Sequence, residues 1–147
     1  MIREEGKTLE YILDIDHIIG LISGSEEIVG RVTGMKNHGA RFGITVTILG
    51  ELYFLIRSTA QMDANVASLT ELVADLYVWG FDRGAAEIAG EILTQARSLG
   101  RPISEAEAQI AAIARQRQAT LLTGVERFAD VRDIGMENWL RPQSARR

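Results

Sequence analysis

The sequence contains no cysteine, and this absence removes a whole group of chemistries. Disulfide bonds, thiolate nucleophiles and zinc sites with cysteine ligands are all excluded, and a reducing compartment is compatible with the chain. We therefore expect a cytoplasmic protein. A metal site in this chain would have to use oxygen ligands or the two histidines, His17 and His38.

The chain also lacks a long apolar run and an excess of basic residues. No apolar stretch approaches the about 20 residues that span a bilayer, and the N-terminal MIREEGK carries charges of both signs, unlike a signal or transit peptide. We expect no membrane association. The net charge of −4 argues against a broad electrostatic grip on nucleic acid. It does not exclude a nuclease, because a site that gathers carboxylates around cations is locally acidic.

Length and patterning indicate one α/β domain. With 147 residues, 46% of them hydrophobic, the chain can build one real core, so we predict a single domain over residues 1–147 with a frayed basic tail at about 141–147. Strand-like and helix-like segments alternate, which predicts a doubly wound, mainly parallel sheet. The motifs GxGxxG, GxxxxGK[ST] and GxSxG are absent from the sequence, so neither a glycine-rich nucleotide loop nor a serine nucleophile elbow is indicated.

The predicted elements follow from the spacing of the apolar residues. Strands are predicted at residues 9–13, 42–46, 78–81, 120–123 and 134–140. Helices are predicted at 16–23, 26–33, 47–56, 63–77, 83–99 and from 104 onward, with a loop at 34–41 and a helical turn at 125–129.

Two acids follow the first strand directly, in the segment LEYILDID. An acid at the carboxyl end of a central parallel strand lies in the crevice where open α/β sheets bind their ligands. For Asp14 we favour this functional interpretation over helix capping. For Asp16 a capping role and a functional role remain equally open.

A third acid, Glu51, interrupts the apolar stripe of a predicted helix. It lies three residues after Ile48 and four before Leu55, so its carboxylate projects from the buried face. A charge in this position is costly unless it is paired or binds a metal. A metal site and an arginine partner at the edge of the stripe are the two alternatives.

Glu107 is a further candidate acid, and it fits two roles. The spacing from Ser104 to Glu107 matches a capping box, in which serine and glutamate bond reciprocally to the first turn of a helix. Glu107 also shares a helix face with Ile110 and Ala114, which directs it toward the core side. Both interpretations remain open from the residues alone.

The order of five blocks resembles a known family. LDIDH, TVTILGELYF, GRPISEAEAQIAAIA, LLTGVERF and MENWL follow one another as in PIN-domain ribonucleases, in particular the VapC-type toxins of toxin-antitoxin pairs. The resemblance covers nearly the whole chain. It implies a small PIN-like α/β/α domain of three layers, with a central, mainly parallel sheet of four to five strands.

The resemblance also implies a site and its chemistry. Asp14, Glu51 and Glu107 correspond to the family's first three acids, with Asp16 and Thr123 in supporting positions. These acids would hold Mg²⁺ or Mn²⁺, and the metal would activate water for attack on an RNA phosphodiester.

The family further implies partners. An antitoxin protein would lie across the acidic groove and present an arginine to the carboxylates. A homodimer is expected as well. The candidate contact residues of the homodimer, which also fit a core position, are Ile18, Ile19, Leu21 and Ile22.

The chain departs from the family pattern at the fourth acid. The positions where this acid is expected hold Val125 or Arg127, depending on how the turn is aligned. From a shifted turn, Glu126 is a weak substitute and Asp130 a further one, although both also fit an ordinary surface charge, the favoured interpretation for Asp130. Glu107 departs as well, because the family usually has the shorter aspartate there, and Mg²⁺ is strict about geometry. An alternative function is therefore a PIN domain with weakened or lost catalysis that acts as an RNA-binding or protein-interaction module.

A different enzyme class fits the first block alone. LDID also matches the strand-end DxD of haloacid-dehalogenase-like phosphatases, in which the first aspartate is the nucleophile. That family needs a late lysine and a late acidic pair, but the only lysines are Lys7 and Lys36 and no such pair follows. The rest of the chain therefore argues against a phosphatase.

Overall fold

A computed structural model describes residues 6–140 of the chain. Five parallel strands form one sheet in the order β3-β2-β1-β4-β5. The strands are β1 (Glu10–Leu13), β2 (Arg41–Thr45), β3 (Tyr77–Trp79), β4 (Thr120–Leu122) and β5 (Gly135–Glu137). The predicted α/β fold with a parallel sheet is confirmed, while the predicted tail at 141–147 lies outside the described residues.

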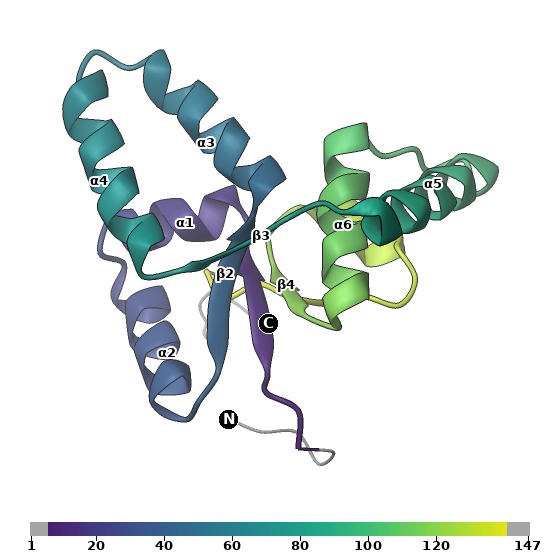
Figure 1. Cartoon of the computed structure of the whole chain (residues 1–147), viewed down its shortest axis with the longest axis horizontal. Helices are drawn as coiled ribbons and strands as arrows, with labels where there is room; N and C mark the ends of the chain where they lie inside the picture. Colours follow the sequence, from purple (N-terminus) through teal and green to yellow (C-terminus); the bar gives the residue numbers. More distant parts are fainter. Residues whose placement is uncertain (1–5, 141–147) are drawn as a thin grey trace, which may run out of the picture.

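Helices cover both faces of the sheet and complete three layers. Figure 1 shows α1 to α4 on one side of the strands and α5 and α6 on the other. The helices are α1 (Ile15–Ile22), α2 (Glu26–Asn37), α3 (Val46–Arg57), α4 (Met62–Ala74), α5 (Arg83–Ser98) and α6 (Glu105–Arg117), and a short 3-10 helix, η1, spans Glu126–Asp130. No helix within residues 6–140 combines the length and the apolar character needed to cross a membrane.

The strand order reverses direction at β1. From β1 the chain winds outward to β2 and β3 on one side, and then crosses over to β4 and β5 on the other. The carboxyl ends of β1 and β4 therefore lie next to each other, with Leu13 in register with Leu122. In open parallel sheets the crevice at such a reversal is where ligands bind.

Three element boundaries differ from the predicted ones by three residues or more, and the others by at most two. Residues 34–37 continue α2 rather than forming a loop: the His38 ring lies 2.9 Å from the Gly34 carbonyl oxygen, and the chain turns only at Gly39, where φ is +91°. α4 ends at Ala74, because Tyr77 already pairs with β2.

The last strand is also shorter than the predicted 134–140, since β5 ends at Glu137. The N–H of Trp139 donates to His17 Nε2 at 3.0 Å, and the N–H of Leu140 donates to the Asn138 side chain at 3.0 Å. Both amides are therefore withdrawn from the β4–β5 ladder.

The core depends on a close approach between β2 and β3. Gly43 lies beneath Trp79, and a Cβ atom at this position would come within 2.7 Å of both the Trp79 ring and the Tyr77 carbonyl oxygen. The Tyr77 carbonyl belongs to the backbone of β3, so it cannot move aside as the end of a flexible side chain could. Glycine at position 43 therefore allows the two strands to pair with the Trp79 ring packed over them.

We predict that Gly43→Ala lowers the free energy of unfolding by about 1 to 3 kcal/mol, the usual cost of overpacking a core. Gly90→Ala is the matched control: a Cβ at this exposed position of α5 meets nothing within 4 Å, and alanine is the better helix former. Urea unfolding of both variants checks this. A Gly43→Ala protein as stable as Gly90→Ala would contradict the account.

Candidate functional site

Asp14 lies at the reversal of strand order and is held from two sides. Its Oδ1 accepts from the N–H of Ile15 at 2.8 Å, which makes it the N-cap of α1. Its Oδ2 accepts from the hydroxyl of Thr123 at 2.7 Å. The capping role and the site role are thus combined in one side chain. Burial raises the pKa of Asp14, the Thr123 and Ile15 hydrogen bonds offset this only in part, and the negative charge of Asp16 raises it further.

Asp16 is fixed by the turn after β4 and by a buried histidine. The N–H of Gly124 donates to its Oδ2 at 2.7 Å, and His17 Nδ1 lies 2.7 Å from its Oδ1. The Nε2 of His17 accepts the N–H of Trp139, so the proton of the neutral ring is on Nδ1 and is donated to Asp16. Burial raises the pKa of Asp16, but these hydrogen bonds outweigh it and hold the pKa below its usual value.

Gly124 permits this arrangement, because a Cβ atom there would lie 2.9 Å from Asp16 Oδ2. The sequence offered His17 only as a possible metal ligand, whereas in the structure both of its ring nitrogens are engaged by Asp16 and Trp139. A signal for His17 existed: a histidine within an apolar helical segment is costly unless both ring nitrogens find partners. Its partner, the backbone of Trp139, is 122 residues away and invisible to local pattern.

Glu51 projects from α3 and stands half-buried. Among the described residues it has no hydrogen bond or ion pair, so the predicted arginine partner is not found. Burial raises the pKa of Glu51, and the negative charges of Asp14 and Glu107 raise it further. Glu51 therefore carries an uncompensated charge that a cation would neutralise.

Glu107 opens α6 and makes two sets of contacts. It forms the predicted capping box with Ser104, whose N–H donates to Glu107 Oε1 at 3.0 Å while its hydroxyl oxygen accepts from the N–H of Glu107 at 3.0 Å. Arg127 from η1 also grips the carboxylate, with Nε donating to Oε1 at 3.2 Å and Nη2 donating to Oε2. Burial raises the pKa of Glu107, but the Arg127 and Ser104 contacts prevail and lower it.

The four acids line one cleft. Asp14, Asp16, Glu51 and Glu107 surround a cavity of about 330 Å³ whose remaining wall is apolar, formed by Ile15, Ile19, Ile110, Val125 and Phe128. The structure thus brings together the three principal predicted acids and Asp16, with Thr123 supporting Asp14 from beneath. Apolar walls lower the local dielectric, which strengthens the repulsion between the carboxylates.

Glu126 and Asp130 do not join this cleft. Both are exposed on η1, and neither lines the cavity. Asp130 instead pairs with Arg101 at 2.8 Å. The turn after β4 therefore contributes no fourth acid from these two positions.

The donor chemistry of the cleft fits a hard divalent cation. Carboxylate oxygens are the ligands that Mg²⁺ and Mn²⁺ prefer, and Glu51 has both oxygens available. Within residues 6–140, however, no three Asp, Glu or His side chains are close enough to ligate one ion together. The acids would have to rotate toward one another to do so.

Comparison with known proteins identifies the family of this fold. The family model of the PIN domain matches residues 11–134. Among solved structures, the fold is similar to DNA-bound VapBC from Salmonella typhimurium (25% identity, TM-score 0.82, covering 90% of this chain and 99% of that one). It is also similar to VapBC2 from Rickettsia felis bound to a promoter DNA fragment, with 20% identity, a TM-score of 0.84, and coverage of 89% of this chain and 99% of that one.

A third similar structure is FitAcB from Neisseria gonorrhoeae, with 19% identity, a TM-score of 0.76, and coverage of 90% of this chain and 99% of that one. The comparison with curated proteins finds no match. The family model covers most of the sequence, including Asp14, Glu51 and Glu107, and the neighbours share its fold along nearly their whole length. The chain therefore belongs to the PIN domain family.

Proposed function

We propose that this protein is a toxin-like, metal-dependent endoribonuclease that hydrolyses RNA phosphodiesters and is neutralised by an antitoxin protein. The observation that carries the proposal is the meeting of four carboxylates in one cleft where the strand order reverses. The family of the chain, and neighbours that are VapBC complexes, support a toxin nuclease.

The surroundings of each acid indicate whether it would bind the metal or position other residues. Asp14 and Glu51 would hold Mg²⁺ or Mn²⁺, because their oxygens face the cleft and their charges are the least compensated. Thr123 positions Asp14 through its hydroxyl, and Asp16 holds the turn after β4 through the N–H of Gly124. The bound metal would supply an activated water and positive charge toward the phosphodiester.

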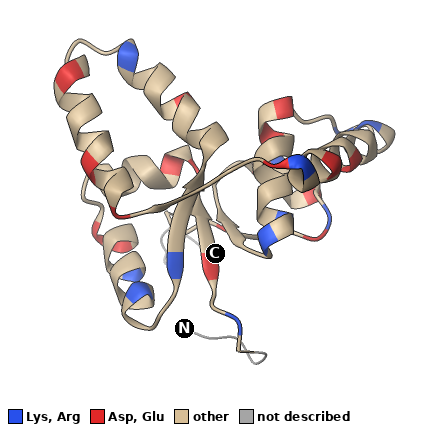
Figure 2. Ribbon diagram, viewed as in Figure 1, with Lys and Arg blue, Asp and Glu red and all other residues tan. Residues whose placement is uncertain are grey.

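RNA would bind through a few contacts at the metal-loaded cleft rather than through an extended basic surface. Figure 2 shows Lys and Arg scattered over several elements and interspersed with Asp and Glu, and the net charge is −4. A locally neutralised acidic cleft can bind a phosphate group despite this overall charge. We therefore expect the salt dependence of RNA binding to reflect few contacts.

Two protein partners are expected, an antitoxin and a second copy of the chain. The solved VapBC neighbours are toxin-antitoxin complexes, and by analogy an antitoxin would cover the acidic cleft. For the expected homodimer, Ile18 is fully buried and serves the core, whereas Ile19 and Ile22 are 53% and 48% exposed. We propose that the homodimer uses Ile19 and Ile22 rather than Ile18.

The decisive experiment is cleavage of a pool of structured RNAs by the purified chain with Mn²⁺, with Mg²⁺ and with EDTA. We expect cleavage that requires metal and is lost in Asp14→Asn, which keeps the shape of the side chain but removes a metal-binding charge. Asp75→Asn, at an exposed position after α4, is the matched control and should cleave as the natural chain does.

A non-catalytic PIN module is the second candidate function. It is favoured by one observation: both oxygens of Glu107 are already engaged by Arg127. Well-folded protein that binds RNA or an antitoxin-like partner without cutting, in either metal, would favour this candidate over the nuclease.

The proposed function also predicts a conflict between stability and metal binding at Glu51. Its raised pKa means that the folded state favours the protonated form, so stability is full below the ordinary glutamate pKa and falls as the pH rises through the raised value. We expect Glu51→Gln to raise the urea midpoint in EDTA at pH 7, with the difference disappearing near pH 4.

Added Mn²⁺ should reverse this order, because it stabilises the natural chain more than the variant. Glu87→Gln, on the exposed face of α5, is the control and should leave the midpoint unchanged at both pH values. A Glu51→Gln protein that is less stable than the natural chain at pH 7 without metal would show that the charge is not a burden.

A further inference from the structure

We propose that Arg127 is the built-in second cation of this site: it replaces a second metal ion at Glu107, so that the cleft takes one divalent ion, and it binds the phosphate of the RNA. This inference rests on the proposed function and deepens it. Arg127 is thereby a substrate-binding residue supplied by the chain at one of the positions where the family's fourth acid is expected.

The contacts of Glu107 leave little room for a metal. Its Oε2 accepts from Arg127 Nη2, and its Oε1 accepts both from Arg127 Nε at 3.2 Å and from the N–H of Ser104 at 3.0 Å. The two-pronged contact matches the planar fork of a guanidinium to a carboxylate, the geometry in which arginine binds most specifically. An ion at Glu107 would have to displace this fork.

The backbone of Arg127 is anchored to the site itself. Phe128, the next residue, is 2% exposed and lines the acidic cleft. Two residues earlier, the N–H of Val125 donates at 3.0 Å to the same Thr123 hydroxyl that donates to Asp14. The turn that carries Arg127 is therefore tied to the acid that would hold the metal.

The outer end of Arg127 is available to a ligand. Its side chain is 61% exposed, whereas that of Glu107 is only 15% exposed. Nε and Nη2 are used by Glu107, and within the part of the chain that the structure describes Nη1 has no hydrogen-bond partner. Three of the five N–H groups, two on Nη1 and one on Nη2, thus remain for a ligand beside the cleft, in a fork suited to phosphate oxygens.

Charge balance favours one metal ion over two. Four carboxylates line the cleft, and the guanidinium of Arg127 compensates one of them. One divalent ion at Asp14 and Glu51 then leaves the site slightly negative, whereas two would leave it positive before any phosphate arrives. In a two-metal site the second ion stabilises developing charge; here the fixed positive charge next to Glu107 occupies that place.

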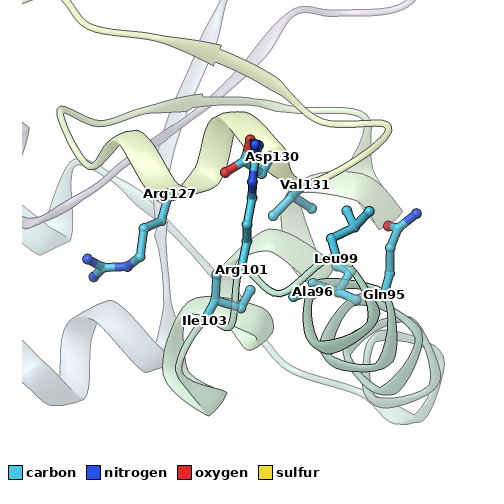
Figure 3. A pocket seen from close by; sticks show the side chains of 9 residues that line it. Gln95, Ala96, Leu99, Arg101, Ile103, Arg127, Asp130 and Val131 are labelled. Carbon is cyan, nitrogen blue, oxygen red and sulfur yellow. The ribbon is translucent and has the colours of Figure 1, made fainter.

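A neighbouring arginine offers a matched comparison. Figure 3 shows Arg101 directed at Asp130, while the Arg127 side chain extends away from this pair, although both arginines border the same pocket. Arg101 and Asp130 are 2.8 Å apart, and both are exposed. Removing Arg101 therefore deletes an arginine of the same region without touching the acids.

The test is the number of Mn²⁺ ions bound per chain, measured by calorimetric titration of Mn²⁺ into the 147-residue protein. We expect one ion for the natural chain and for Arg101→Ala. Arg127→Ala should bind two, because Glu107 is released. Circular dichroism checks that each variant is folded, as expected for changes at exposed side chains.

A second readout is independent of metal. In EDTA, the affinity of Arg127→Ala for a single-stranded RNA should fall roughly tenfold, and the slope of log affinity against log salt should become shallower by about 0.7, the value for one lost phosphate contact. Arg101→Ala should leave both quantities unchanged.

The outcomes separate the two proposals. Two Mn²⁺ ions on the natural chain, or one ion and an unchanged salt slope for Arg127→Ala, overturn the role of Arg127 and leave a metal-dependent nuclease standing. No Mn²⁺ on the natural chain refutes the proposed function, and the inference with it. One ion rising to two, together with the shallower slope, supports both.

Discussion

The hydrogen bond from the Thr123 hydroxyl to Asp14, 2.7 Å long, is the contact on which the site depends. It joins the ends of β1 and β4, which are neighbours only because the strand order reverses there. The same hydroxyl accepts the N–H of Val125, and so it fixes the turn that carries Arg127. One buried oxygen thus contacts both Asp14, an acid of the cleft, and the turn that leads to Arg127, the cation paired with Glu107.

Four carboxylates lie around this contact, and their burial disfavours the ionised form. Burial raises the pKa of Asp14 and of Glu51, whereas Asp16 and Glu107 are kept ionised by His17 and Arg127. The site is therefore divided into two compensated acids and two that are not. Asp14 is buried and Glu51 half-buried. Uncompensated carboxylates in such positions cost stability unless a ligand neutralises them, and such groups cluster at functional sites.

The sequence predicted those parts of the site that depend on local pattern. Asp14 was recognisable from its place after an apolar strand, Glu51 from its place in an apolar helical stripe, and the Glu107 capping box from its spacing to Ser104. The contacts of Arg127 and His17 were not predictable, because their partners lie 20 and 122 residues away. The ends of α2 and β5 were missed because His38, Asn138 and His17 redirect backbone bonds there.

The most direct test of the account is where a divalent ion binds. Crystals of the protein soaked in Mn²⁺ would locate the ion by its anomalous scattering. We expect a peak inside the cleft, in contact with the carboxylates of Asp14 and Glu51, and no ion that displaces Arg127 from Glu107. A cleft without a peak, or an ion bound at Glu107 with Arg127 swung away, would contradict it.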